Sequence, residues 1–264
     1  MPRYSFIVLE RLDSFQSPDD LHKKLIDLSE AGYEGVEFSL TEPSGIDLDQ
    51  LQSWTGDLGL EVPSFLTGEA YNDGLCLSSP LASIRRQTVE RLIRYVDVAD
   101  RFGAILVIGL LQGLRSDEPD PEIANERIAE CLRQVGDVAE AKGVDCVMEP
   151  VNHLQVGFNN SVDEVLQLIE KVGSGAIRPM VDTVHMNIEE SSQTSPIVRC
   201  GAQLRHVHLC ESNGARFGSG HIDFSAVLHA LDEIDYPHFA SVKVYRNLAW
   251  KEAVDSSLRY LKNL

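Results

Sequence analysis

The chain alternates eight times between short runs of apolar, β-favouring residues and longer amphipathic stretches. The short runs lie at 4–10, 35–40, 60–67, 104–110, 144–150, 177–183, 204–209 and 239–245. Because these runs are nearly continuous in apolar residues, each is expected to be buried on both faces, as in a parallel sheet covered by helices. The length of 264 residues suits one (β/α)8 barrel, a fold of about 250 residues. We therefore predict an α/β protein with a single TIM barrel domain over residues 1–264.

The stretches between the runs carry the signals of helices. Their apolar residues recur at spacings of three and four, and four of them end in glycine, at positions 32, 103, 143 and 173, as is common just beyond a helix. Ser161 followed by Glu164 predicts a capping box at the start of a helix. A doubly wound open sheet is the less favoured architecture, because the first run is not followed by a glycine-rich phosphate loop.

Charge and cysteine content exclude several classes of partner. Acidic residues number 41 and basic residues 23, for a net charge of −18, which argues against nucleic acids and anionic membrane surfaces as partners. The five cysteines form no Cys-x-x-Cys pair, so neither a disulfide framework nor a zinc knot is indicated. We find no signal peptide and no apolar run long enough for a membrane span. The expected location is cytoplasmic.

Ionisable side chains gather at the ends of the last four runs, where a barrel places its functional residues. Glu149, Asp182 and His208 form a set of two carboxylates and one imidazole, which suits a divalent ion such as Mn²⁺, Co²⁺, Mg²⁺ or Zn²⁺. The alternative is that they are ordinary polar residues at the rim. His206 and His208 are expected to face opposite sides of their strand, so that at most one points into the barrel mouth.

Four motifs in this region together carry a family resemblance. They are EPVN (149–152), VDTVHMNIEE (181–190), HVHLCESN (206–213) and GSGHIDF (218–224). With them the chain resembles the xylose isomerase-like barrel superfamily, and most closely its D-tagatose 3-epimerase-like ketose epimerases. The resemblance implies a metal, usually manganese, held by Glu149, Asp182 and His208, with His185 contacting the substrate. It also implies a fourth ligand, a glutamate on the eighth strand, that moves a proton together with Glu149 at the carbon next to the ketose carbonyl.

The chain departs from that pattern at three positions. Lys243 stands where the eighth-strand glutamate is expected, and Gln155 where the epimerases commonly have a substrate-contacting glutamate. Gly214 stands where an arginine often follows the ESN motif, with Arg216 two residues later.

Lys243 leaves three arrangements open. An ammonium about 4 Å from a divalent ion is repelled by about 8 kcal/mol at an effective dielectric constant of about 20. The lysine could be neutral and act as a base, with its pKa lowered by the metal and by burial. It could turn toward the substrate while three protein ligands and water hold the metal. Alternatively the metal is absent and the ammonium pairs with Glu149 and Asp182.

From these features we predict a divalent-metal-dependent sugar isomerase or epimerase acting on a ketose or keto-sugar through an enediolate. Glu149 and Lys243 are the predicted catalytic residues. The predicted substrate contacts are His185, Asn152, Glu211, Arg216 and Glu37. Two alternatives stay open: a lyase or dehydratase acting on a 3-keto sugar or glycoside, and a non-catalytic sugar-binding barrel in which Lys243 replaces the metal.

Some candidates also have a second interpretation. Glu37 contacts a sugar hydroxyl or forms an ion pair at the rim, and Arg246 binds an anionic substrate group or is simply solvated. The resemblance extends to self-association, so a homo-oligomer is a further expectation.

Overall fold

Eight parallel strands close into a barrel in the order in which they follow one another along the chain. A computed structural model describes residues 2–15, 17–246 and 248–264. The strands are β1 (Arg3–Arg11), β2 (Gly35–Ser39), β3 (Ser64–Leu66), β4 (Ile105–Ile108), β5 (Cys146–Met148), β6 (Ile177–Asp182), β7 (His206–Cys210) and β8 (Phe239–Lys243). Pairing of β1 with β8, in which Ser5 lies opposite Ser241, closes the barrel. The predicted (β/α)8 fold is confirmed.

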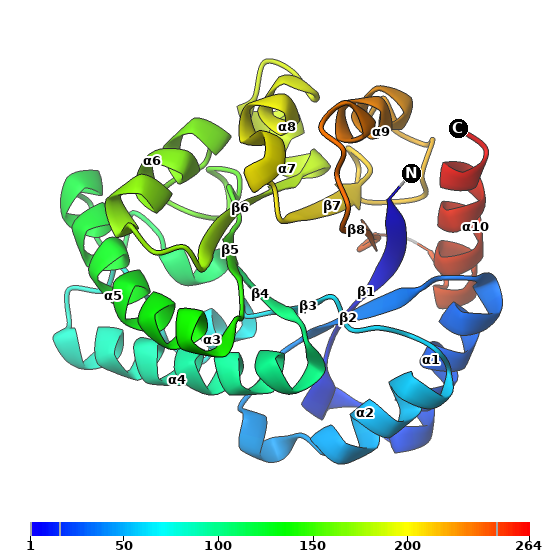
Figure 1. The fold of residues 1–264 in the computed structure, drawn as a ribbon, viewed down its shortest axis with the longest axis horizontal. Helices are drawn as coiled ribbons and strands as arrows, with labels where there is room; N and C mark the ends of the chain where they lie inside the picture. The colour runs from blue at the N-terminus through cyan, green and yellow to red at the C-terminus, as the bar shows by residue number, and fades with distance from the viewer. Residues whose placement is uncertain (1, 16, 247) are drawn as a thin grey trace.

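Helices surround the strands on all sides (Figure 1). They are α1 (Pro18–Ala31), α2 (Leu48–Asp57), α3 (Glu69–Asn72), α4 (Ala82–Phe102), α5 (Pro121–Lys142), α6 (Val162–Val172), α7 (Thr183–Glu189), α8 (Ser195–Cys200), α9 (Phe224–Glu233) and α10 (Trp250–Lys262). The glycines after α1, α4, α5 and α6 all adopt the left-handed conformation, as predicted. The capping box of Ser161 and Glu164 is confirmed at α6. Within the described residues, no helix combines the length and the apolar character that a membrane span requires.

Burial explains why the strands read as continuous apolar runs. Every residue of β2, β4, β5 and β7 is buried, because one face packs on helices and the other fills the barrel. The strands are mostly shorter than the runs that predicted them. The fifth run reaches Pro150, for example, whereas β5 ends at Met148, so the polar residues that follow belong to the mouth rather than to the sheet.

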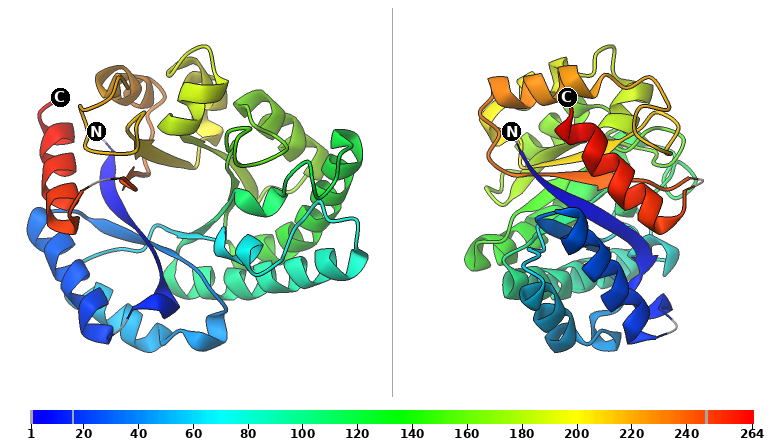
Figure 2. Two further views of the ribbon diagram at one scale, coloured as in Figure 1. Left: turned by 180° about the vertical axis from the view of Figure 1, so that it is seen from behind. Right: turned by 90° about the vertical axis from the view of Figure 1, so that its right-hand side faces the viewer.

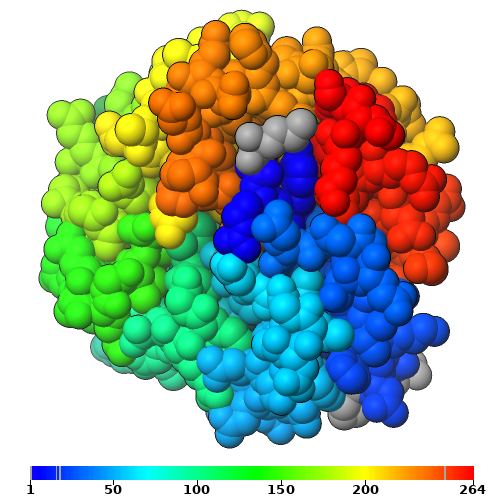
Figure 3. Space-filling view, turned by 45° about the vertical axis from the view of Figure 1, so that its right-hand side comes forward, coloured from blue at the N-terminus to red at the C-terminus, as the bar shows by residue number. Residues whose placement is uncertain are grey.

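The two ends of the chain meet where the barrel closes. Figures 2 and 3 show the last helix, α10 (red), beside the first strand and first helix (blue). The Trp250 ring lies edge-on to the Phe6 ring, with centroids 5.2 Å apart, and Lys24 Nζ lies 4.0 Å from the Trp250 centroid. These contacts pack α1 and α10 over the outside of β1, next to its pairing with β8.

Candidate active site

The carboxyl ends of β5 to β8 bring four ionisable side chains together. Glu149 directly follows β5, Asp182 ends β6, His208 lies within β7 and Lys243 ends β8. The ligand atoms of Glu149, Asp182 and His208 all lie within 4.8 Å of one another, and all three side chains are buried. The sequence-predicted ligand set is therefore assembled by the fold. We call these three residues the ligand cluster.

Two atoms of the ligand cluster point to a cation. His208 Nδ1 lies 3.6 Å from Glu149 Oε1 and 3.7 Å from Asp182 Oδ2. Neither His208 Nδ1 nor Glu149 Oε1 has a hydrogen-bond partner among the described residues, although both are buried. Buried polar atoms normally have partners, and a nitrogen and an oxygen turned toward one point are donors of the kind that divalent metals prefer.

Lys243 reaches into the same region. Its Nζ donates a hydrogen bond to Asp182 Oδ2 at 2.8 Å. Burial acts to lower the pKa of Lys243, but the carboxylates of Asp182 and Glu149 outweigh burial and raise it above the ordinary value. Among the protein's own groups the ammonium form of Lys243 is therefore favoured, and its bond to Asp182 is part of the pairing in the third arrangement. An ammonium has three N–H groups, so two remain after the bond to Asp182.

The charges around the ligand cluster fit a divalent ion even with this ammonium present. Three carboxylates lie in the buried region, those of Glu37, Glu149 and Asp182, against the single ammonium of Lys243. The buried carboxylates therefore outnumber the ammonium, and this excess of negative charge favours a cation. Burial acts to lower the pKa of His208, but the carboxylates of Asp182, Glu149 and Glu37 outweigh burial and raise this pKa well above its ordinary value.

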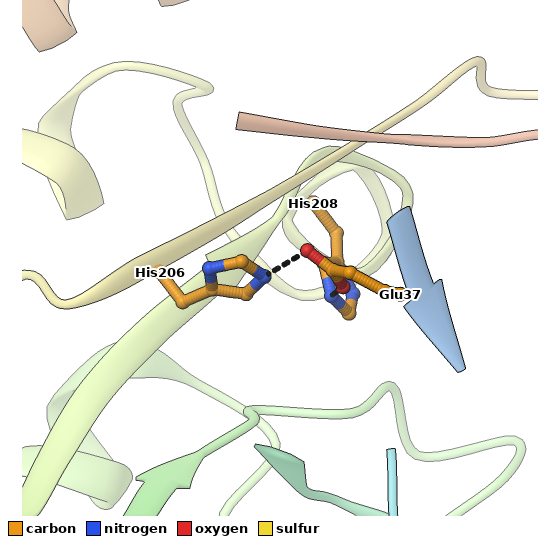
Figure 4. A group of neighbouring side chains, drawn as sticks. All are labelled: Glu37, His206 and His208. Carbon is orange, nitrogen blue, oxygen red and sulfur yellow. Dashed lines mark ion pairs between the residues drawn. The ribbon is translucent and has the colours of Figure 1, made fainter. Parts of the chain in front are cut away.

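A second polar group lies deeper in the barrel, below the ligand cluster. Figure 4 shows the Glu37 carboxylate of β2 between the two imidazoles of β7. His206 Nε2 lies 3.0 Å from Glu37 Oε1, and His208 Nε2 lies 3.4 Å from Glu37 Oε2. The prediction that His206 and His208 face opposite sides is wrong, because residues two apart on a strand share a face. Both rings point into the barrel.

The environment of Glu37 also differs from the rim ion pair considered for it. The side chain is fully buried in the middle of β2. Ser5 donates to Glu37 Oε1 at 3.1 Å, Ser64 donates to Glu37 Oε2 at 2.7 Å, and Ser241 also donates to Oε1. Three hydroxyl groups from β1, β3 and β8 thus hold the carboxylate in place. It lies behind His208, on the side from which a carboxylate orients a metal-binding histidine, although His208 Nε2 at 3.4 Å makes no hydrogen bond within the described residues.

Asn152 orients the imidazole of His185. The backbone N–H of Leu154 donates to Asn152 Oδ1 at 3.1 Å, which leaves the amide nitrogen Nδ2 to donate to His185 Nδ1 at 2.7 Å. Burial lowers the pKa of His185, so the ring is neutral and its proton lies on Nε2. That nitrogen is 3.6 Å from Glu149 Oε1. Asn152 therefore positions His185, and it also lines the larger cavity described below.

Glu211 and Arg216 lie away from the ligand cluster. The buried Glu211 carboxylate accepts backbone N–H groups from Ser212, Gly218 and Ile222, which shapes the loop between β7 and α9. Arg216 is exposed on that loop and lines neither cavity described below. The structure thus gives Glu211 a role in organising the loop and places Arg216 outside both cavities.

Two adjoining cavities open above the ligand cluster. The smaller, of about 210 Å³, is lined by Glu149, and the larger, of about 410 Å³, is lined by Asn152 and Arg246. Both are lined by His185 and Lys243. Both also include Leu9 and Gln155. Together they provide a small-molecule site with an ionisable floor.

Two residues contribute to the site although no sequence motif marks them. Gly109, just after β4, lies against the Glu149 side chain, and a Cβ at this position would come within 2.5 Å of Glu149 Oε2. Glycine at position 109 therefore allows the Glu149 carboxylate to occupy its observed position. The buried Gln112 donates through Nε2 to the backbone oxygen of Glu149 at 3.1 Å. The glycine at position 109, next to the end of the apolar run 104–110, is the only hint of this in the sequence.

Comparison with known proteins identifies relatives of this arrangement. The chain is 31% identical over 244 residues to an L-ribulose 3-epimerase of Mesorhizobium japonicum, which covers 89% of this chain and 81% of that protein. It is 31% identical over 211 residues to a ketose 3-epimerase of Arthrobacter globiformis, covering 78% and 71% of the two chains.

Solved structures show the same fold. A structure of L-ribulose 3-epimerase superposes with a TM-score of 0.87 at 26% identity over 100% of this chain and 94% of the other. A D-allulose 3-epimerase from Methylomonas sp. in complex with D-allulose gives a TM-score of 0.87 at 23% identity, covering 99% and 96%. The family description "Xylose isomerase-like TIM barrel" matches residues 25–264. The chain belongs to the xylose isomerase-like TIM barrel family.

Proposed function

We propose that this protein is a ketose epimerase that moves a proton at the carbon next to the carbonyl of a small sugar. The observation that carries the proposal is the buried Glu149 carboxylate on the floor of the smaller cavity, with Oε1 free of hydrogen-bond partners among the described residues. The relatives named above are 3-epimerases, which supports this reaction. The ligand cluster, to which Glu149 itself belongs, supports its chemistry.

Glu149, Asp182 and His208 would hold the divalent ion, for which we propose Mn²⁺. When bound, such an ion polarises a substrate carbonyl and stabilises the negative charge that develops when the neighbouring carbon loses its proton. The protein's own contribution is to fix the three ligands. Glu37 stands behind His208, and Gly109 and Gln112 fix the side chain and backbone of Glu149.

Epimerisation requires one group to remove a proton and another to return a proton to the opposite face of the same carbon. We assign removal to Glu149 from the β5 side. Lys243 lies at the end of β8 and lines the same cavity, and we assign to one of its two unused N–H groups the delivery of the new proton. His185 contributes its Nε2–H as a neutral donor to a substrate oxygen, in the ring orientation that Asn152 sets.

The test is solvent exchange. In D₂O, a panel of ketopentoses and ketohexoses should acquire deuterium at the carbon next to the carbonyl, detected by NMR, and the product should have the mass of the substrate plus that deuterium. Chelator-treated protein, with and without added Mn²⁺, provides the control. No deuterium uptake across the panel would contradict proton transfer, and loss of water from the product would identify elimination instead.

Glu37 gives a prediction that measures metal binding without turnover. Replacing Glu37 with glutamine keeps the size of the side chain but removes the charge that faces His208, so Mn²⁺ affinity should fall by about 10- to 100-fold. Calorimetric titration of the metal-free protein measures the effect. Glu211→Gln is the matched control, because it neutralises another fully buried carboxylate outside the ligand cluster. Equal affinities in wild type and Glu37→Gln would show that Glu37 does not act through His208.

Cytoplasmic location and self-association stay predictions of the sequence. Glu37, Glu211 and Arg216, which the sequence also suggested as substrate contacts, line neither cavity, so we do not assign them to the substrate.

A further inference from the structure

The larger cavity differs in charge from the rest of the molecule. The chain has 41 acidic and 23 basic residues, yet the lining of this cavity contains no aspartate or glutamate. It contains two permanent cations, Lys243 and Arg246, together with neutral polar side chains such as Gln155, Ser212 and Asn213. In a protein with a net charge of −18, a carboxylate-free cavity with two cations favours an anionic ligand.

Arg246 is available to such a ligand. Most arginines of this protein pair with carboxylates, as Arg3 does with Glu34 and Arg199 with Glu190. Among the described residues, no carboxylate lies within ion-pair distance of Arg246. Lys243, by contrast, is bonded to Asp182. The guanidinium of Arg246 is therefore the uncompensated positive charge of the cavity, in a side chain suited to bidentate binding of carboxylate or phosphate.

The backbone that carries Arg246 is held in place. The N–H groups of Tyr245 and Arg246 donate to the carbonyl oxygen of Gly214, at 3.0 and 2.9 Å. Gly214 has a φ of +69°, and a Cβ there would come within 2.2 Å of the Tyr245 ring. A residue other than glycine would push Tyr245 and its neighbour away. The loops after β7 and β8 are thus joined in a way that fixes the origin of the Arg246 side chain at the cavity edge.

We propose that the substrate is an anionic ketose whose carboxylate or phosphate group binds Arg246 in the larger cavity. This inference rests on the proposed function, because it places the reacting carbon beside Glu149 in the smaller cavity. His185, Gln155 and Lys243 line both cavities, so one molecule can extend from Glu149 to Arg246. The volume of about 410 Å³ suits a small ligand. The negative group then lies at the end of the sugar away from the carbon that exchanges its proton.

The experiment compares binding of three matched ketoses to the Mn²⁺-loaded protein by calorimetry. D-fructose is the neutral probe, D-fructuronate carries a carboxylate at the sixth carbon and D-fructose 6-phosphate carries a phosphate there. One of the anionic probes should bind at least tenfold more tightly than D-fructose, and which one identifies the anion. Arg246→Gln should weaken that binding by about 10- to 100-fold, as expected for loss of a charged hydrogen bond, and should remove most of the preference over D-fructose. Arg259→Gln, an exposed arginine on α10, is the matched control.

The inference is overturned if neither anionic probe binds more tightly than D-fructose, or if Arg246→Gln weakens all three probes equally. It is also overturned if Arg216→Gln, rather than Arg246→Gln, removes the preference. Failure of the proposed function has a different signature. An anionic ketose that binds through Arg246 but acquires no deuterium would leave the anion site standing and refute the epimerase. Deuterium uptake by D-fructose without any preference for an anionic probe would support the epimerase and overturn the anion site.

Discussion

Replacing Glu149 with glutamine should reduce the rate of deuterium uptake by a ketose substrate by about 10²- to 10⁴-fold, the usual contribution of a general acid or base. Glutamine has nearly the same shape, so the close fit against Gly109 is retained, but an amide does not accept the substrate proton. The rate is measured by NMR in D₂O at saturating Mn²⁺, because Glu149 is also an expected ligand.

Glu126→Gln is the matched control, since it makes the same chemical change on the exposed surface of α5. It should exchange at the wild-type rate. Thermal unfolding of both variants shows whether they are folded, and metal content shows whether the cluster is filled. If Glu149→Gln is metal-loaded and folded yet exchanges within about threefold of wild type, another residue removes the proton.

Replacing Lys243 with methionine should separate proton exchange from epimerisation. Glu149 remains able to remove and return a proton on its own face, so deuterium uptake continues, whereas delivery to the opposite face loses its donor. We expect epimerisation to slow by about 10²- to 10⁴-fold and to fall well below exchange, followed by NMR in the same sample. Parallel losses of both rates would instead assign Lys243 to binding or to support of Asp182.

The same lysine should also control metal affinity. In Lys243→Met the repulsion between ammonium and cation is removed, and in Lys243→Glu a carboxylate is gained as well. Mn²⁺ should therefore bind at least tenfold more tightly to Lys243→Met than to wild type, and more tightly still to Lys243→Glu, by calorimetry. Lys251→Met, an exposed lysine on α10, is the control. Weaker Mn²⁺ binding by both Lys243 variants would mean that the ammonium supports the ligand cluster rather than competing with the cation.

Much of the site could be predicted because a parallel barrel gives sequence position a fixed spatial meaning. Residues that end successive strands share one rim, so Glu149, Asp182 and Lys243 could be grouped from the ends of their runs. The pairing of Ser161 with Glu164 was equally readable, since both partners of a capping box lie within one turn. The capping rule, which acts within one helical turn, and the shared rim of a parallel barrel were sufficient to predict these features.

Other parts of the site depend on which side chains meet across the barrel. Nothing near Glu37 in the sequence indicates that Ser5, Ser64 and Ser241 would surround its carboxylate. Arg216 was the more evident arginine because it follows the ESN motif, yet the cavity is lined by Arg246. These contacts join residues far apart in the chain, and their geometry is set by strand register and by the course of the loops.

The sequence by itself determined the eightfold alternation and the barrel, and the polar residues that end its runs predicted the members of the ligand cluster. Apolar periodicity and strand order carry that information along the chain. The tertiary structure decided that Lys243 donates a hydrogen bond to Asp182, that Glu37 lies behind His208, and that Arg246 lines a cavity without carboxylates. Charge and hydrogen bonding depend on neighbours in space, and these are fixed only when the barrel closes.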